Sequence, residues 1–304
     1  MNVGLTGPAV RRPVYNQRFP FSDQSVHMRF GVSTHLFHDQ RLSRDHLSQI
    51  AAHGFEAVEV FATRSHFDYH DPSAIVQLGE WLKETGLALH GIHAPIVESM
   101  HGADKWGAVI SNAVGDAAKR QAAVSEAGVA LNIARHIPTS VLVVHLGTPT
   151  VQGGENSRTA AFRSVEEICR LAEPIGIRVA LEVIPNPLSD AASLITMIER
   201  DLDAPLAGIC LDFGHAFLMG DVTDAIELVA EHLVATHVHD NDGKADQHLV
   251  PFDGRINWSA ALMTMQKIGY DGTYLMELAN TSTPADVLRK AQAARARFEK
   301  LMAY

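Results

Sequence analysis

The sequence predicts a (β/α)8 barrel (TIM barrel) formed by one domain over residues 30–304, preceded by an N-terminal extension over residues 1–29. Short runs rich in apolar and β-branched residues alternate with longer segments of helical periodicity from residue 30 onward. Eight such runs occur, and a helical segment follows nearly all of them, as a closed barrel requires. An open doubly wound sheet is the alternative, but no G-x-G-x-x-G turn follows the first run, FGVSTHLF.

The expected strands are nearly continuous apolar runs, because strands of a parallel sheet are buried on both faces. SVLVVHLG at 140–147 is the clearest example. In chain order, the eight expected strands span residues 30–37, 55–62, 87–95, 140–147, 177–185, 206–214, 233–240 and 272–278.

The expected helices carry apolar residues at helical spacing and have recognisable ends. PSAIVQLGEWLKETG at 72–86 begins with proline and ends with glycine, which is the usual asymmetry of helix ends. The first expected helix begins at Ser43, and the last runs from Thr283 to the C-terminus. Between them, helices are expected over residues 72–86, 115–136, 157–173, 190–201, 221–231 and 257–269.

The composition is that of an ordinary globular chain, with 304 residues, 46% hydrophobic and 20% charged, enough for one large core. The net charge of −10 gives no general attraction to phosphate polymers, so we do not expect a nucleic-acid partner. Cys169 and Cys210 form no disulfide framework, no apolar run approaches the length of a membrane span, and residues 1–29 lack the apolar core of a secretory signal. We therefore expect a cytoplasmic protein without a membrane partner.

The segment THVHDNDGKADQHLVPFDGRINW at 236–258 is the most informative stretch of the chain. His237 and His239 are two residues apart in an expected strand, so both side chains lie on one face of it. A loop rich in aspartate and glycine follows and adds Asp246 and His248. Imidazole and carboxylate groups at this density are the ligands that a divalent metal ion needs.

Metal-competent residues also end the neighbouring expected strands, where the chemistry of such barrels is located. In chain order these are His93, His145, Glu182, Asp212 with His215, His237 with His239, and Glu277. Burying so many carboxylates without a cation would be costly, so the sequence predicts a metal centre. Mixed nitrogen and oxygen ligands suit Mn²⁺, Co²⁺ or Zn²⁺, whereas oxygen ligands alone favour Mg²⁺; the sequence leaves the metal and a number of one to three ions open.

Other residues are candidates for substrate binding or for supporting the ligands. For substrate binding we single out His93, His215, Asn186, Lys244 and Trp258. Tryptophan side chains can also wall a sugar-sized pocket, and the chain offers Trp81, Trp106 and Trp258. Trp81 lies in an expected helix, where packing is the alternative, and the alternative for Trp258 is that it seats the helix that follows it.

Three further residues complete the candidates. Asp240, together with Asn186 and Lys244, is also a candidate for orienting metal ligands. His35 follows the first expected strand, where it either contacts substrate or lies in a solvated loop, and Glu59 in the second is a candidate for binding a substrate hydroxyl.

The motifs GIHAPI, VVHLG, LEVIPNP, LDFGHAFLMGD, HVHDNDGKADQH and GYDGTYLMEL together resemble the sugar phosphate isomerase/epimerase superfamily with its xylose-isomerase-like barrel. The resemblance covers about residues 30–300. The superfamily's single-metal epimerases use a Glu, Asp, His, Glu ligand set, which implies Glu182, Asp212, one of His237 and His239, and Glu277 here.

The resemblance also implies a reaction. One glutamate removes a proton from carbon, the metal stabilises the resulting cis-enediolate, and the other glutamate returns a proton. It therefore implies a metal-dependent isomerase or epimerase of a small sugar or sugar phosphate, with Glu182 and Glu277 as the acid/base pair. The oligomeric state, including a homo-oligomer, stays open.

The chain is also similar to endonuclease IV, a three-zinc barrel of the same superfamily. Its nine ligands find counterparts at His93, His145, Glu182, Asp212, His215, His237, Asp246, His248 and Glu277. The loops APIVESMHG and VIPNP depart from that family, and no stripe of arginine, lysine and aromatic residues suits bent DNA. Alternatives to an isomerase are thus a dehydratase or lyase with the same enediolate chemistry, a metal-dependent phosphodiesterase, and a non-catalytic sugar- or metal-binding barrel.

Overall fold

Eight parallel strands close into a barrel in the order β1 to β8, with β1 also paired to β8. This computed structural model describes residues 28–100, 106–153 and 155–303. The strands are β1 (Arg29–Ser33), β2 (Ala57–Phe61), β3 (Ala88–His93), β4 (Val141–Val144), β5 (Arg178–Glu182), β6 (Ala207–Asp212), β7 (Leu233–Val238) and β8 (Thr273–Met276). The predicted (β/α)8 barrel is therefore confirmed, whereas residues 1–27 of the expected extension lie outside the described residues.

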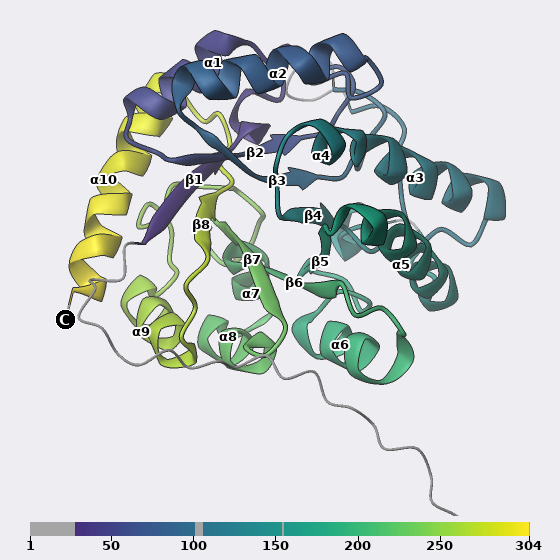
Figure 1. The fold of residues 1–304 in the computed structure, drawn as a ribbon. Coiled ribbons are helices and arrows are strands. Elements are labelled where there is room, and N and C mark those ends of the chain that lie inside the picture. Colours follow the sequence, from purple (N-terminus) through teal and green to yellow (C-terminus); the bar gives the residue numbers. More distant parts are fainter. Residues whose placement is uncertain (1–27, 101–105, 154, 304) are drawn as a thin grey trace, which may run out of the picture.

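Helices surround the strands, and α10 closes the ring between α9 and α1 (Figure 1). The α-helices are α1 (Arg44–Ala52), α2 (Pro72–Thr85), α3 (Ala117–Ala130), α4 (Asn132–His136), α5 (Arg158–Ala172), α6 (Ala191–Thr196), α7 (Phe213–Met219), α8 (Val222–Val229), α9 (Trp258–Ile268) and α10 (Pro284–Met302). Shorter turns are η1 (Thr34–Phe37), η2 (Thr150–Gln152), η3 (Glu173–Ile175) and the π-helical η4 (Met197–Asp201). None of the helices within the described ranges has the length and hydropathy that a membrane span requires.

Polar side chains fix where the helices begin. Asp71 accepts a hydrogen bond from the backbone of Ser73 at the start of α2, and Asn257 accepts one from Ala260 at the start of α9. At the other end of α2, Gly86 adopts a φ of 72°, a left-handed conformation that glycine reaches without strain. The caps explain why the helix ends could be predicted within a few residues.

The strands end a few residues earlier than the sequence-based expectation, and at two of them a helical turn takes the place of the last expected residues. The first strand ends at Ser33, whose side chain accepts a hydrogen bond from His35 and starts the turn η1. The sixth strand ends at Asp212, which caps α7, so His215 lies in the first turn of a helix and not in a loop. Both changes turn the chain inward just after a strand, where the site lies.

The core has two parts. Most apolar side chains fill the layer between the strands and the helices. A smaller cluster inside the barrel consists of Val141, Val143, Ala180, Cys210 and Ala235. Toward the carboxyl ends of the strands the interior becomes polar. Apolar side chains therefore fill one part of the barrel interior, and ionisable side chains fill the other.

Candidate metal centre

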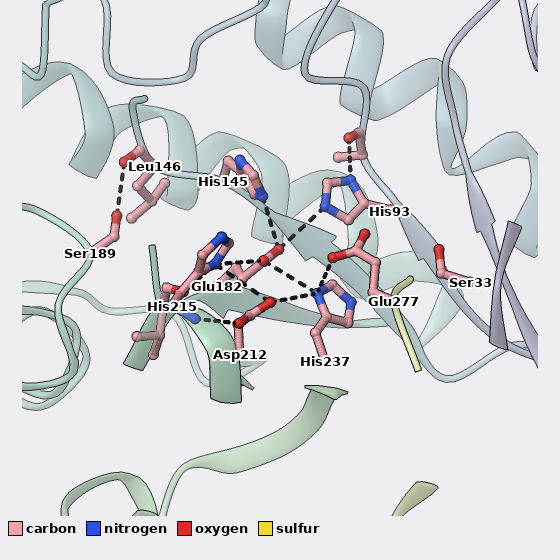
Figure 2. Close-up of polar contacts among 12 residues, drawn as sticks. Ser33, His93, His145, Leu146, Glu182, Ser189, Asp212, His215, His237 and Glu277 are labelled. Carbon is pink, nitrogen blue, oxygen red and sulfur yellow. Dashed lines mark hydrogen bonds and ion pairs between the residues drawn. The ribbon is translucent and has the colours of Figure 1, made fainter. Parts of the chain in front are cut away.

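The predicted ligands converge at the carboxyl-terminal mouth of the barrel. His93, Glu182 and Asp212 are the last residues of β3, β5 and β6, and His145 and Glu277 directly follow β4 and β8. Figure 2 shows the side chains of these strands pointing toward one another, with Glu182 in the middle. The closed topology therefore brings together residues that are up to 184 positions apart in the sequence, as between His93 and Glu277.

Glu182 is the centre of the cluster. Its Oε2 lies 3.3 Å from Nε2 of His93 and 3.0 Å from Nε2 of His145. Its Oε1 lies 3.2 Å from Nδ1 of His237 and 3.5 Å from Nδ1 of His215. One buried carboxylate is thus surrounded by four imidazoles.

A second set of contacts joins the other carboxylates to the same place. Nδ1 of His237 lies 3.4 Å from Oε2 of Glu277 and 4.0 Å from Oδ2 of Asp212. Together with Glu182 these residues offer four ligand atoms within 4.8 Å of one another. This is the Glu, Asp, His, Glu set that the sequence predicts, and all four side chains are buried.

A further group lies beside it, around Asp246. Oδ2 of Asp246 accepts a hydrogen bond from Nε2 of His215 at 3.0 Å and one from Nε2 of His248 at 3.2 Å. The ring of His239 stacks on that of His248 at 3.9 Å, and its Nε2 lies 3.0 Å from Asp212. Asp212 therefore connects the two groups, and these residues form another set with ligand geometry: His215, His239, Asp246 and His248.

Two backbone features make room for this second group. Gly214 lies under the imidazole of His239, and a Cβ on Gly214 would overlap that ring. His248 has a φ of 46°, a left-handed conformation that is uncommon for a residue other than glycine. Such strain is often found at functional sites, because it is kept only where the position of the side chain matters.

The charges of the cluster depend on one another. Burial alone would raise the pKa of Glu182, but the imidazoles of His145 and His237 outweigh it and lower that pKa well below its ordinary value. Burial would lower the pKa of His215, but Asp212 and then Asp246 raise it well above the usual range. Likewise burial opposes, and Asp246 causes, a rise of the pKa of His248 to about 9. The carboxylates thus stay ionised because a positive charge is held beside them.

Several buried ligand atoms of the cluster lack hydrogen-bond partners within the part of the chain that the structure describes, and a divalent cation could replace such partners. Both oxygens of Glu182, Nδ1 of His237 and Nδ1 of His239 are buried, yet none has a hydrogen-bond partner among the described residues. The ion pairs that Glu182, Asp212 and Glu277 make in the described part of the chain are all with histidines. Buried polar groups without partners are costly, and a cation held by these atoms would satisfy them.

A cavity of about 330 Å³ opens above the cluster. Glu182 and Glu277 lie at its surface, whereas His237 and His239 do not. One wall is apolar and is formed by Phe61, Ile96, Val97, Trp106, Val109 and Ile110. Within the described residues the cavity lining contains no lysine or arginine.

The apolar wall belongs mostly to the long connection between β3 and α3. Its two arms are joined by isolated antiparallel bridges between Val97 and Val109 and between Met100 and Trp106. Of this wall, sequence-based reasoning singled out only Trp106. The length of the connection was the available signal for the other residues, since long loops in compact domains often cover a site.

Three residues expected to bind substrate lie elsewhere. Asn186 is buried and organises its own loop, accepting hydrogen bonds from Leu188 and Ser189. Lys244 is exposed and does not line the cavity. Trp258, at the start of α9, is buried, donates a hydrogen bond from Nε1 to Asp240, and does not line this cavity. By contrast, His35, His93 and His215 all line the cavity.

Comparisons with known proteins agree with this geometry. A family model described as "Xylose isomerase-like TIM barrel" matches residues 47–300. The uncharacterized protein MJ1311 of Methanocaldococcus jannaschii is 29% identical over 262 residues, which cover 83% of this chain and 84% of that protein. The crystal structure of a D-tagatose 3-epimerase-like protein is 26% identical, with a TM-score of 0.74, and the match covers 91% of this chain and 98% of that one. The IOLI protein, solved with a bound zinc atom, has a TM-score of 0.72 at 15% identity over 90% and 98% of the two chains, a likeness of fold.

Proposed function

Because this chain belongs to the xylose isomerase-like TIM barrel family, we propose that it is a divalent-metal-dependent isomerase or epimerase of a small keto sugar. One observation carries the proposal. Glu182 and Glu277 come from different strands, face the same cavity, and each lies within 3.4 Å of Nδ1 of His237. Two carboxylates at one substrate cavity beside a set of metal ligands are what proton transfer at carbon requires.

The cation would be held by Glu182, Asp212 and Glu277 with a histidine from the end of β7. When bound, it supplies Lewis-acid stabilisation of negative charge on neighbouring substrate oxygens. The mixture of carboxylate and imidazole ligands suits Mn²⁺, Co²⁺ or Zn²⁺. Asp212 also accepts a hydrogen bond from the backbone of His215, which fixes its carboxylate at the start of α7.

The two glutamates would transfer the protons. One of them removes the proton from the carbon next to the substrate carbonyl, and the other delivers a proton to the opposite face or to the neighbouring carbon. Positioned general acids and bases typically contribute about 10²- to 10⁴-fold to a rate. His35, His145 and His215 line the same cavity and can form hydrogen bonds with substrate hydroxyl groups.

We further propose that the substrate is not phosphorylated. Proteins bind phosphate with arginine, lysine or a helix N-terminus, and the described lining of the cavity has neither cationic residue. The acidic groups Glu182, Asp246 and Glu277 at its surface would repel a phosphate dianion. The volume of about 330 Å³ and the apolar wall accommodate an uncharged sugar with one apolar face.

The test is proton exchange in deuterated water. The metal-loaded protein is incubated with a panel of ketoses, and deuterium bound to carbon is measured by NMR or mass spectrometry. We expect exchange in the wild type and a fall of about 10²-fold or more in Glu277→Gln. The matched control is Glu199→Gln, which removes the same charge from an exposed residue paired with His232. No exchange with any ketose would contradict the proposal, and loss of water from the substrate would indicate a dehydratase.

A metal-dependent phosphodiesterase is a second candidate, and the group of His215, His239, Asp246 and His248 favours it. Such a group offers ligands for a further cation beside the first set. Against it stands the cavity, which offers no arginine or lysine to a phosphate backbone within the described residues. Nicking of a duplex with a single abasic analogue, at a rate above that of the ketose exchange, would favour this second candidate.

A further inference from the structure

Glu59 and His237 form a buried pair at the metal centre, and Glu59 has no part in the function proposed so far. Glu59 on β2 is 1% exposed, and His237 on β7 is fully buried. Nε2 of His237 donates to Oε2 of Glu59 at 3.2 Å and lies equally close to Oε1. Neither residue lines the cavity, so the expectation that Glu59 binds a substrate hydroxyl is wrong.

The pair crosses the inside of the barrel. β2 and β7 are not neighbours in the sheet, so their side chains meet only across the interior. The space for the carboxylate comes from Gly91 on β3, where an added Cβ would lie 3.3 Å from Oε2 of Glu59 and 2.8 Å from Val141. Besides His237, Glu59 contacts Ser33, whose Oγ donates to Oε1 at 3.3 Å.

Stability does not explain this pair. Replacing a buried ion pair with apolar residues of similar volume is often neutral or stabilising, because each charge loses its hydration on burial. Gly91 lies next to both Glu59 and Val141, and Val141 belongs to the apolar cluster inside the barrel, so a leucine in place of Glu59 would lie beside that cluster. A carboxylate at this depth therefore calls for a reason in the chemistry above it.

That reason is the orientation of His237. With Nε2 bound to Glu59, the ring is fixed and its Nδ1 points to Glu182 at 3.2 Å and to Glu277 at 3.4 Å. Figure 2 shows these contacts converging on one ring nitrogen of His237. Without Glu59, Nε2 of His237 loses the carboxylate to which it donates.

We propose that Glu59 is a positioning residue of the metal centre, which acts through His237 to hold Glu182 and Glu277 in place. The inference rests on the proposed function, since it assigns those two glutamates to the cation and to proton transfer. Partners one step removed from a metal typically change its affinity by about 10- to 100-fold when they are removed.

The test compares Glu59→Leu and Glu59→Gln with the wild type, using Co²⁺ as the probe. Affinity is measured against a competing chelator, and the visible absorption of bound Co²⁺ reports the geometry of its ligands. We expect Glu59→Leu to bind Co²⁺ about 10- to 100-fold more weakly than the wild type, with an altered spectrum, and to have a lower Tm, because His237 stays buried without its partner. Glu59→Gln keeps an acceptor for Nε2 of His237, and its affinity should lie between those of the other two proteins.

The matched control is Thr236→Val on the same strand. Thr236 is buried next to His237, but its hydroxyl donates to the backbone of Thr273 on the other side of the sheet. We expect this control to lose stability and to keep the affinity and spectrum of Co²⁺. A change in Co²⁺ binding as large as that of Glu59→Leu would mean that any buried defect in β7 has the effect, and would overturn the proposal.

Other outcomes separate this inference from the proposed function. If Glu59→Gln and Glu59→Leu both bind Co²⁺ with the affinity and spectrum of the wild type, the role of Glu59 is overturned and the proposed function is not affected. If Glu59→Leu does not fold, equal Co²⁺ affinities of Glu59→Gln and the wild type would overturn that role instead. Absence of ketose exchange would contradict the isomerase and leave the Co²⁺ comparison valid, whereas failure of the wild type to bind Co²⁺ would end both.

Discussion

Asp240 allows a stability prediction whose size follows from its hydrogen bonds. This fully buried carboxylate follows β7 and accepts four of them. Oδ1 accepts from the backbone of Asn241 at 2.9 Å and of Ile256 at 3.0 Å, and Oδ2 accepts from the backbone of Phe252 at 2.9 Å and from Nε1 of Trp258 at 2.8 Å. The loop that presents Asp246 and His248 to the cavity is thus closed by one side chain.

In Asp240→Asn, an NH₂ group replaces one oxygen, and either orientation of the amide leaves two of the four donors facing it. A buried donor without an acceptor costs about 1–3 kcal/mol, so we expect a loss of about 2–6 kcal/mol. Since 1 kcal/mol corresponds to about 2–4 °C in domains of 150–250 residues, Tm should fall by about 4–24 °C.

Thermal unfolding followed by circular dichroism measures the effect, with Asp242→Asn as the matched control. Asp242 lies in the same loop, and its Oδ1 alone accepts hydrogen bonds, from the backbones of Lys244 and Ala245. Asparagine keeps that oxygen while removing the same charge, so the control should lose less than about 1 kcal/mol. Equal losses of Tm in the two variants would refute the reasoning.

Three more predictions concern the cation, the acid sensitivity of the fold and the cavity wall. Removal of the metal with a chelator should lower Tm, because the buried carboxylates lose their counter-charge. A divalent ion added back at 100 times its Kd should raise the free energy of unfolding by about 2.7 kcal/mol. A Tm, measured by calorimetry, that no divalent ion shifts would contradict this. Burial lowers the pKa of His66 to about 4, below its unfolded value of about 6.5, so stability should be complete above about pH 6.5 and fall by about 3 kcal/mol as the pH approaches 4. Urea unfolding of His66→Gln should show a weaker acid dependence, whereas exposed His136→Gln should behave as the wild type. Trp106→Ala should raise KM about 2- to 10-fold with kcat little changed, because Trp106 belongs to the apolar wall of the cavity and is not one of the groups proposed to transfer protons. A selective fall in kcat would contradict this.

The strand ends could be predicted from the sequence because they depend on two regular features. Apolar runs mark the strands, and a closed parallel barrel places all their carboxyl ends at one mouth. That is why Glu182, Asp212 and Glu277 were predicted as a cluster although they come from three strands. The resemblance to the xylose-isomerase-like superfamily is likewise confirmed, since the model of the xylose isomerase-like TIM barrel family matches residues 47–300.

The contacts of each side chain could not be predicted in the same way. The alternation of side chains along a strand predicts that His237 and His239 share one face, but it does not predict which residues they contact. The contacts depend on depth in the barrel. His237 contacts Glu59 across the interior, whereas His239 contacts Asp212 and His248. The roles of loop residues are equally non-local. Trp258 donates a hydrogen bond to Asp240, which lies 18 positions earlier, and no periodic pattern in the sequence connects the two residues.

The site is supported from two directions, and a double-mutant cycle can show whether these supports are independent. Asp240 holds the loop that carries Asp246 and His248, whereas Glu59 holds His237 under the two glutamates. The hydrogen-bond partners of Asp240 and Glu59 in the described residues do not overlap. The free-energy changes of two substitutions without shared partners usually add within about 0.5 kcal/mol. The loss of Co²⁺ binding free energy in the double variant should therefore equal the sum of the losses in Asp240→Asn and Glu59→Leu.

A larger coupling in this cycle would have a specific meaning. Asp240 and His237 are three residues apart on one chain segment, so coupling would show that the end of β7 moves as a unit when either support is lost. The cation would then depend on the strand end as a whole and not on Glu59 through the ring of His237. Additivity is therefore what the separate hydrogen bonds require, because each support reaches the carboxylates through different atoms.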